Sequence, residues 1–286
     1  ALKTREEIEK AVRNMGYMQA VVHLNEKTKN KKMHLSYNIV AGHPYLVKHI
    51  AYNIDDLQIN EIIESDSLHS YLYEGMPLDV VTLDRERQRI TKLLQNSGYY
   101  KFNKDFIVYQ ADTIRNSYLV DLTMKLLPYR RRKEDAPTKH QTFKIRNVNF
   151  VTDDNVINMG NDFIGYDSIR YKGLHFYFKD NYYLRPNTLY DFNHIRPQSL
   201  YNEQDVQDTY TSMGRLRALK YTNIRFNEVN QNDSIQLDAN VLLTKTKNKS
   251  LSFEIEGTNS AGDLGAAASV TFQHRNLFKG SETFSI

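Results

Sequence analysis

The feature that most constrains the fold is an internal repeat of one structural unit. A helical pattern ends at Gly16, Tyr17 follows, and two runs of alternating apolar residues come next. The order returns 82 positions later, where Gly98 and Tyr99 follow a second helical pattern, and again where Tyr221 takes the place of Tyr99. Glycine commonly supplies the left-handed conformation that ends a helix. The repeat predicts an array of similar modules.

Hydrophobic periodicity predicts the elements of each copy. The first copy has helical positions Ile8, Ala11, Val12 and Met15, then strand positions Val22, Leu24, Met33, Leu35, Tyr37 and Ile39. The second has Leu83, Ile90, Leu93 and Leu94, then Phe106, Val108, Tyr118, Val120, Leu122, Met124 and Leu126. The third has a helix over about 203–219, then Ile224, Phe226, Ile235, Leu237, Ala239, Val241 and Leu243.

An opening strand precedes the second and third copies. Its residues Tyr45, Val47, Ile50 and Tyr52 match Phe143, Ile145, Val148 and Phe150 at a constant offset of 98. A short helix, roughly 58–72, follows the first of these strands. The full unit is therefore strand–helix–helix–strand–strand. The first copy lacks its opening strand and helix, so we expect the chain to be cut from a longer one.

An insertion rich in aromatic residues, at about 152–183, follows the opening strand of the third copy. Residues 168–171 and 174–178 flank Lys172-Gly173 and predict a hairpin. One interpretation is an extra flap of sheet that packs on the module. The alternative is a partner-docking flap, because exposed aromatic patches often mark interfaces. On that second interpretation Tyr171, Phe176 and Phe178 are candidate binding residues.

The C-terminal 37 residues have a different pattern. Leu251, Phe253 and Ile255 alternate with polar residues, and a turn cluster follows at 257–263. A second alternating run, an Asn-Leu-Phe-Lys-Gly loop at 276–280, and the start of a third strand at Thr283 complete the tail. This pattern predicts the first strands of a sheet that continues in a longer protein. A reading frame extended by roughly 400 residues of alternating strands would fit that expectation.

These patterns together resemble a known family. Tandem strand–helix–helix–strand–strand units of about 80 residues resemble polypeptide-transport-associated (POTRA) domains, and residues 37–50 look like the passage from one such domain to the next. Residues 256–265 and 275–282 resemble the barrel entry of the BamA/TamA outer-membrane assembly family. Within that family, the insertion and the tail look closest to the TamA-like (TamL) proteins of Bacteroidetes.

The resemblance implies an α+β fold of tandem POTRA modules, each a three-stranded mixed sheet with two helices on one face. The start of a transmembrane β-barrel follows them. The expected parts are a partial first module at 1–41, a complete second module at 42–128 and a linker at 129–141. A third module at 142–248 and barrel strands at 249–286 follow. Leu251, Phe253 and Ile255 belong to the barrel-entry strand.

The implied function is that of a periplasmic arm of a cell outer-membrane protein that assembles, inserts or translocates outer-membrane proteins. Expected partners are unfolded outer-membrane β-barrel proteins, accessory periplasmic or inner-membrane assembly proteins, and the outer membrane through the missing barrel. An open strand edge can bind a client strand by β-augmentation. We expect this edge at about 104–112, with Phe106, Ile107, Val108 and Tyr109 as binding residues. Strands at about 19–26 and 223–229 are its equivalents.

Composition argues against several other classes of function. The chain has no cysteine, which excludes disulfides and thiolate chemistry, and its nine histidines show no metal-ligand spacing. The net charge is only +4, so we expect no nucleic-acid partner. We expect no enzyme, no catalytic residue, no metal and no cofactor. Two alternatives stay open: a non-catalytic docking or spacer arm for accessory proteins, and the arm of a two-partner secretion transporter.

Overall fold

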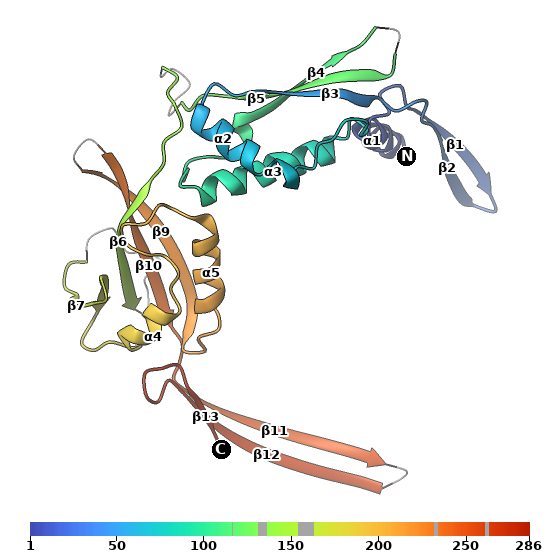
Figure 1. Cartoon of the computed structure of the whole chain (residues 1–286). Coiled ribbons are helices and arrows are strands. Elements are labelled where there is room, and N and C mark those ends of the chain that lie inside the picture. The colour runs from blue at the N-terminus through green and yellow to red at the C-terminus, as the bar shows by residue number, and fades with distance from the viewer. Residues whose placement is uncertain (116, 131–135, 154–162, 232–233, 261–262) are drawn as a thin grey trace. The chain divides into compact units, whose positions relative to one another are not determined.

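A computed structural model of the chain describes residues 1–286 except 116, 131–135, 154–162, 232–233 and 261–262. The described residues form two compact units (Figure 1). Unit 1 contains Ala1–Gln95 and Lys101–Gln141, and unit 2 contains Asn96–Tyr100 and Thr142–Ile286. No helix among the described residues is long and apolar enough to cross a membrane.

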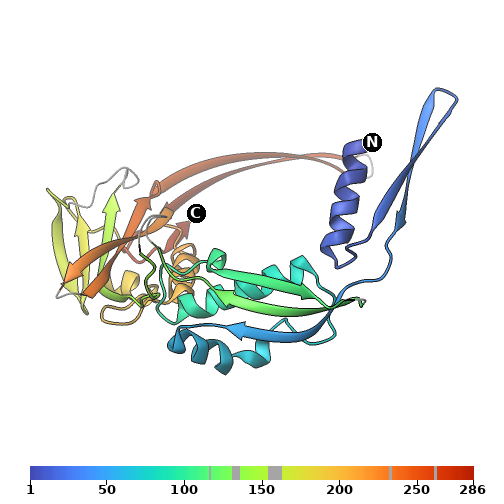
Figure 2. The ribbon, with the colours of Figure 1, turned by 90° about the horizontal axis from the view of Figure 1, so that it is seen from above.

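Unit 1 begins with one helix and one hairpin. Helix α1 (Leu2–Asn14) packs beside an antiparallel hairpin of β1 (Val21–Lys29) and β2 (Lys32–Val40), as Figure 2 shows. Arg13 and Glu9 pair across one turn of α1, and the Arg13 guanidinium also donates to the carbonyl of Ala20. These contacts fix the helix against the start of the hairpin.

The complete module of unit 1 follows the predicted order. Its elements are β3 (Leu46–Asn53), α2 (Leu57–Ser65), the 3₁₀ turn η1 (Ser67–His69), α3 (Val80–Asn96), the 3₁₀ turn η2 (Lys104–Phe106), β4 (Ile107–Thr113) and β5 (Leu119–Leu126). The sheet order is β3-β5-β4, with β3 parallel and β4 antiparallel to the central β5. Both helices cover one face of this sheet (Figure 1). Alternate residues of β5 (Val120, Leu122 and Met124) are buried, as a strand with one face on a core requires.

Unit 2 contains a larger module. Its elements are β6 (Lys144–Asp153), β7 (Asp167–Tyr171), β8 (Leu174–Phe178), α4 (Pro186–Asp191), α5 (Glu203–Met213), β9 (Leu219–Gln231) and β10 (Ser234–Lys245). The sheet order is β7-β8-β6-β10-β9. The predicted hairpin of the insertion is confirmed as β7 and β8, and β8 pairs in parallel with β6. The insertion therefore widens the sheet of the module.

A separate antiparallel sheet ends unit 2. It consists of β11 (Lys249–Ser260), β12 (Asp263–Arg275) and the short β13 (Thr283–Ser285). Leu251 pairs with Phe272 and Glu256 with Ala267, so the two alternating runs of the tail form one antiparallel hairpin. Figures 1 and 2 show β11 and β12 as one long hairpin that runs out from the module.

Three element boundaries differ from the sequence prediction. The strand expected at 104–112 starts at Ile107, because the Asn103 side chain accepts the N–H of Asp105 and starts a 3₁₀ turn. The helix expected at 203–219 ends at Met213, ahead of Gly214. The helix expected at 58–72 ends at Ser65, and η1 continues it only as far as His69.

The two repeated glycines make equivalent backbone contacts. Gly16 and Gly98 both have left-handed backbone, with φ of 96° and 102°. The carbonyl of Gly16 accepts the N–H of Tyr45 at 2.9 Å, and that of Gly98 accepts the N–H of Phe143 at 2.9 Å. Tyr45 and Phe143 are the residues that matched at the offset of 98. The repeat in the sequence is therefore also a repeat in hydrogen bonding, because each glycine carbonyl holds the opening strand of a module.

Candidate functional site

The open edge of β4 is the strongest candidate for a binding site. At one end of the strand, Leu127 donates its N–H to the carbonyl of Phe106 at 2.7 Å. At the other end, Ile114 donates its N–H to the carbonyl of Leu119 at 2.9 Å. Residues of an antiparallel strand alternate between bonding to the neighbour and facing away from it. The outward N–H and C=O groups are therefore those of Ile107, Tyr109, Ala111 and Thr113.

The side chains of β4 divide between core and surface. Ile107 is fully buried, and Tyr109 packs against the core that Val47 and Leu122 help to form. Burial is the main cause that raises the pKa of the Tyr109 hydroxyl. Val108 faces solvent, 37 % exposed, on the other face of the strand. The edge thus presents its backbone while its inward side chains hold it on the core.

Phe106 lies just before the edge in an aromatic cluster. Its ring centroid is 4.7 Å from that of His140 and 5.6 Å from that of Phe102, which is buried. The ring of Tyr129 lies 6.1 Å away. Of the four residues predicted for this site, only Val108 has its side chain in solvent, so any contact with a partner strand must rely on the backbone.

Strands β1 and β9, the predicted equivalents of β4 in the other two modules, differ from it at their edges. In β1, the N–H of Val22 donates to the carboxylate of Glu9 on α1 at 3.4 Å. In β9, the N–H of Ile224 donates to the hydroxyl of Tyr210 on α5 at 2.8 Å. Among the described residues, no side chain bonds in this way to the outward backbone groups of β4. Helix side chains therefore occupy part of two edges and leave the third open.

A buried ion pair stiffens the complete module behind its sheet. Glu86 is fully buried on α3 and accepts hydrogen bonds from the Ser70 hydroxyl, at 3.0 Å, and the Tyr71 N–H, at 2.9 Å. The Arg89 guanidinium also donates to Glu86 through Nε, at 3.0 Å, and Nη2, at 2.7 Å, and pairs with Asp66. Burial alone lowers the pKa of Arg89, but its bonds and charge interaction with Glu86 raise it overall. This network ties α3 to the end of α2.

The aromatic residues predicted in the insertion are mostly structural. Phe176 stacks on Phe150, with ring centroids 5.1 Å apart, and is only 3 % exposed. Phe178 is 9 % exposed at the end of β8. The interpretation of these two rings as surface contacts is corrected, because β8 joins the sheet beside β6 and brings them into the core. Tyr171 is half-buried against Tyr190.

The residues predicted for the barrel-entry strand are exposed on one face of the hairpin. Leu251, Phe253 and Ile255 are 57 %, 70 % and 86 % exposed. Their partners across the hairpin are Phe272, Val270 and Ala268, so the apolar side chains of both strands share one face. Ser252 and Glu254 pair with Thr271 and Ser269 on the other face. The hairpin is therefore amphipathic, with an apolar face that no described part of the chain buries.

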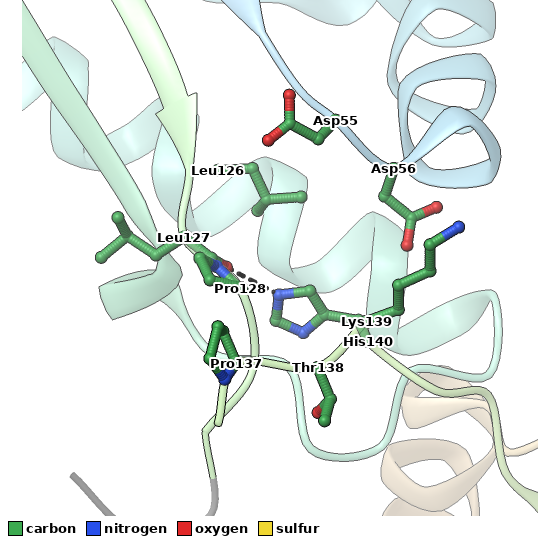
Figure 3. A pocket seen from close by; sticks show the side chains of 9 residues that line it. All are labelled: Asp55, Asp56, Leu126, Leu127, Pro128, Pro137, Thr138, Lys139 and His140. Atoms are coloured by element: carbon green, nitrogen blue, oxygen red, sulfur yellow. Dashed lines mark hydrogen bonds between the residues drawn. The ribbon is translucent and has the colours of Figure 1, made fainter. Parts of the chain in front are cut away.

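A cavity of about 350 Å³ lies at the end of β5 (Figure 3). Its lining is Asp55, Asp56, Leu126, Leu127, Pro128, Pro137, Thr138, Lys139 and His140. His140 donates from Nε2 to the carbonyl of Leu127 at 2.9 Å, and burial lowers the pKa of its imidazole. Sequence reasoning missed this cavity, because it is formed by three segments, 55–56, 126–128 and 137–140, whose residues carry no shared motif. Among the described residues, no cluster of three His, Asp or Glu side chains could hold a metal ion.

The fold and its edges define a class of module: a β-α-α-β-β unit with a three-stranded mixed core sheet, repeated in tandem. Among solved structures, the chain is similar to BamA from Haemophilus ducreyi lacking POTRA domains 1–3. The TM-score is 0.55 at 12 % identity, over 84 % of this chain and 36 % of that one. The chain thus spans about a third of that protein. The fold is that of tandem POTRA domains, so the α+β POTRA fold predicted from the resemblance is confirmed, while the start of a barrel after it stays a prediction.

Other comparisons are weaker. POTRA3–5 of BamA from Haemophilus influenzae matches with a TM-score of 0.46 and 13 % identity, over 85 % of this chain and 79 % of that one. CdiB from Acinetobacter baumannii matches with a TM-score of 0.36 and 12 % identity, over 84 % of this chain and 37 % of that one. No family model matches the sequence, and no curated protein matches it either.

Proposed function

We propose that the chain is the periplasmic arm of an outer-membrane β-barrel protein of the BamA/TamA type, in which the edge of β4 binds extended segments of client or accessory proteins. The outward backbone groups of β4, which no described side chain occupies, carry this proposal. We propose the same module boundaries as above, 42–128 and 142–248. The likeness to TamL proteins remains a prediction.

Strand addition suits a protein with many clients. The edge of β4 offers alternating N–H and C=O groups at Ile107, Tyr109, Ala111 and Thr113, and any extended backbone can pair with them. Such pairing needs no particular side chains, so it reads the extended conformation rather than a sequence. The buried side chains of Ile107 and Tyr109 keep the edge in place while it pairs.

The amphipathic hairpin supports the part of the proposal that attaches the chain to an outer-membrane β-barrel. Outer-membrane barrel strands alternate between apolar residues toward lipid and polar residues toward the lumen. Leu251, Phe253 and Ile255 on one face, with Ser252 and Glu254 on the other, follow that alternation. We propose that β11 and β12 are the first barrel strands and that the modules before them lie in the periplasm.

A proline placed on the edge tests the proposal. Ala111→Pro removes an outward N–H, and proline is tolerated where the N–H of an edge strand faces solvent. Gln110→Pro is the matched control, because it removes an N–H that faces β5 and should destabilise the sheet. The measurement is binding of a fluorescent outer-membrane β-strand peptide to the full chain, with thermal unfolding recorded for each variant.

The expected result is that Ala111→Pro abolishes peptide binding while the second module stays folded. Binding that persists in a folded Ala111→Pro protein would refute the β4 edge as the client site. If a defined accessory protein still binds while the peptide never does, the chain is instead a docking arm.

A further inference from the structure

The loop that follows β12 is held in one conformation by its own polar groups. This coupling loop, Asn276–Glu282, turns through three non-glycine residues with positive φ, namely Asn276, Lys279 and Ser281. The carboxylate of Glu282 accepts the N–H groups of Phe278, at 3.3 Å, and Gly280, at 3.1 Å. Burial alone raises the pKa of Glu282, but these bonds and the charge of Arg185 lower it overall.

The coupling loop is also bonded to the third module. The side-chain amide of Asn276, which is buried, donates to the carbonyl of Tyr183 at 2.8 Å. The N–H of Arg185 donates to the carbonyl of Lys279 at 2.8 Å, and the N–H of Ala218 to the Ser281 hydroxyl at 3.0 Å. The loop therefore has a defined orientation on the module.

This orientation leaves two large apolar side chains in solvent. Leu277 is 48 % exposed and Phe278 is 62 % exposed, at the tip of the loop. The hydrogen bonds above hold the loop in a conformation in which neither side chain is buried. Leu277 and Phe278 are adjacent, and contiguous exposed apolar surface marks sites of protein or membrane interaction.

Positive charge gathers around the loop. Four segments meet here through the bonds above and those of Thr246 and Asn248: residues 182–185, 215–220, 245–249 and 274–282. We call them the basic joint. They contain nine cationic residues, Arg185, Arg215, Arg217, Lys220, Lys245, Lys247, Lys249, Arg275 and Lys279, and one acidic residue, Glu282, although the whole chain has a net charge of only +4. Among the described residues, no carboxylate lies within salt-bridge distance of Arg217, Lys247 or Lys249.

Tyrosines accompany the cations. Lys279 Nζ lies 4.3 Å from the ring centroid of Tyr182, and Lys220 Nζ lies 5.1 Å from that of Tyr221. Tyrosine and basic residues are enriched where membrane proteins meet lipid headgroups. The apolar face of the hairpin starts at Leu251, two residues after Lys249. Cationic residues, tyrosines and apolar side chains are therefore next to one another, as they are where a membrane protein meets a bilayer interface.

We propose that the basic joint is a membrane-surface site, which binds the phosphates of anionic lipid headgroups while Leu277 and Phe278 enter the bilayer interface. The inference rests on the proposed function only in placing the module beside a bilayer. Each cation near an anionic surface strengthens binding about fivefold. The site would hold the third module against the membrane, independently of the strand-binding edge of β4.

A single tryptophan tests the depth of the loop. The chain contains no tryptophan, so Phe278→Trp provides the only indole fluorophore. The full chain is mixed with phosphatidylcholine vesicles with and without phosphatidylglycerol, each carrying brominated acyl chains as quenchers. Leu68→Trp is the matched control, because Leu68 is 96 % exposed but lies in the second module. We expect a blue shift and quenching only for Phe278→Trp, and more strongly on anionic vesicles.

Charge reversal tests the headgroup contact. Arg217→Glu with Lys247→Glu should weaken binding to anionic vesicles by about 25-fold or more, from about fivefold for each lost cation. Lys27→Glu with Lys29→Glu, on the exposed β1, makes the same change of charge elsewhere and should leave binding nearly unchanged. Unquenched Phe278→Trp, or equal losses in both double variants, would overturn the proposal.

Three further outcomes separate this inference from others. If sodium phosphate displaces the chain from vesicles and sodium chloride at the same ionic strength does not, the site recognises free phosphate and the membrane assignment is wrong. If β4 captures strand peptides but the vesicle results fail, only this inference falls. If vesicles bind as expected but no peptide binds, the client function falls and the membrane site stands.

Discussion

The buried carboxylate of Glu86 gives the sharpest prediction about stability. The side chain has no exposed surface and accepts four hydrogen bonds, two of them from Arg89, whose side chain is only 12 % exposed. Glu86→Ala leaves the N–H of Tyr71 and the Nε and Nη2 groups of Arg89 without their acceptor, while Nη1 of Arg89 keeps its bond to Asp66. Breaking a buried pair by removing one partner costs about 3–5 kcal/mol in the free energy of unfolding.

Two further variants separate charge from packing. Glu86→Gln keeps the volume but replaces one acceptor oxygen by a donor, and we expect a loss of about 1.5–3 kcal/mol, the value of hydrogen bonds to charged groups. Replacing both partners, as Glu86→Leu with Arg89→Leu, removes both buried charges and leaves only Asp66, whose side chain is 25 % exposed and can be solvated by water. It should cost less than Glu86→Ala, because apolar replacement of a whole buried pair is often nearly neutral.

Hydrogen exchange measured by mass spectrometry is the suitable assay, because it reports each module separately. We expect faster exchange in β3, β4 and β5 for Glu86→Ala, with β6 and β10 of unit 2 as the internal reference. A loss below about 1 kcal/mol for Glu86→Ala would refute the reasoning, because it would mean that the pair contributes no more than an exposed one. A double variant less stable than Glu86→Ala would also refute it.

Two other predictions concern the repeated glycine Gly98 and the cavity at the end of β5. A Cβ at Gly98 would lie 3.3 Å from the side chains of Leu200 and Thr142, whereas one at Gly75, which also has positive φ, would meet open space. We therefore expect Gly75→Ala to cost about 1–2 kcal/mol from backbone conformation alone and Gly98→Ala to cost more in urea unfolding; equal costs would contradict the steric argument. Burial lowers the pKa of His140, so the unfolded chain binds a proton more readily than the folded one. The contribution of neutral His140 to the free energy of unfolding should be fully present above pH 6.5, its ordinary pKa, and should fall as the pH drops below that value. His140→Phe should flatten this decline in thermal unfolding. An unchanged pH profile in His140→Phe would contradict this assignment.

Much of the fold could be predicted because the repeat is local and periodic. Gly16 and Gly98 identified the ends of equivalent helices, and the alternation of Val120, Leu122 and Met124 identified the central strand of a module. These signals depend on residues close in sequence, whose spacing alone determines which face of a helix or strand they share. The hairpin of β7 and β8 was equally visible, because Lys172-Gly173 lies between two alternating runs.

Predictions about surfaces were less reliable. Phe176 looked like part of an exposed aromatic patch, and the structure places it against Phe150 because β8 extends the sheet. An aromatic residue in a strand has the same local pattern whether its sheet partner is present or absent. Only the pairing of β8 with β6 decides that this ring is in the core.

The sequence by itself therefore determined the order of helices and strands, the tandem repeat and the two-faced pattern of the tail, since each follows from local spacing and turn chemistry. The tertiary structure alone decided which edges are open. Glu9 reaches Val22 and Tyr210 reaches Ile224, while β4 has no such contact among the described residues. It also decided that four basic segments meet around Leu277 and Phe278. Both results depend on contacts between residues distant in sequence, whose packing no local pattern records.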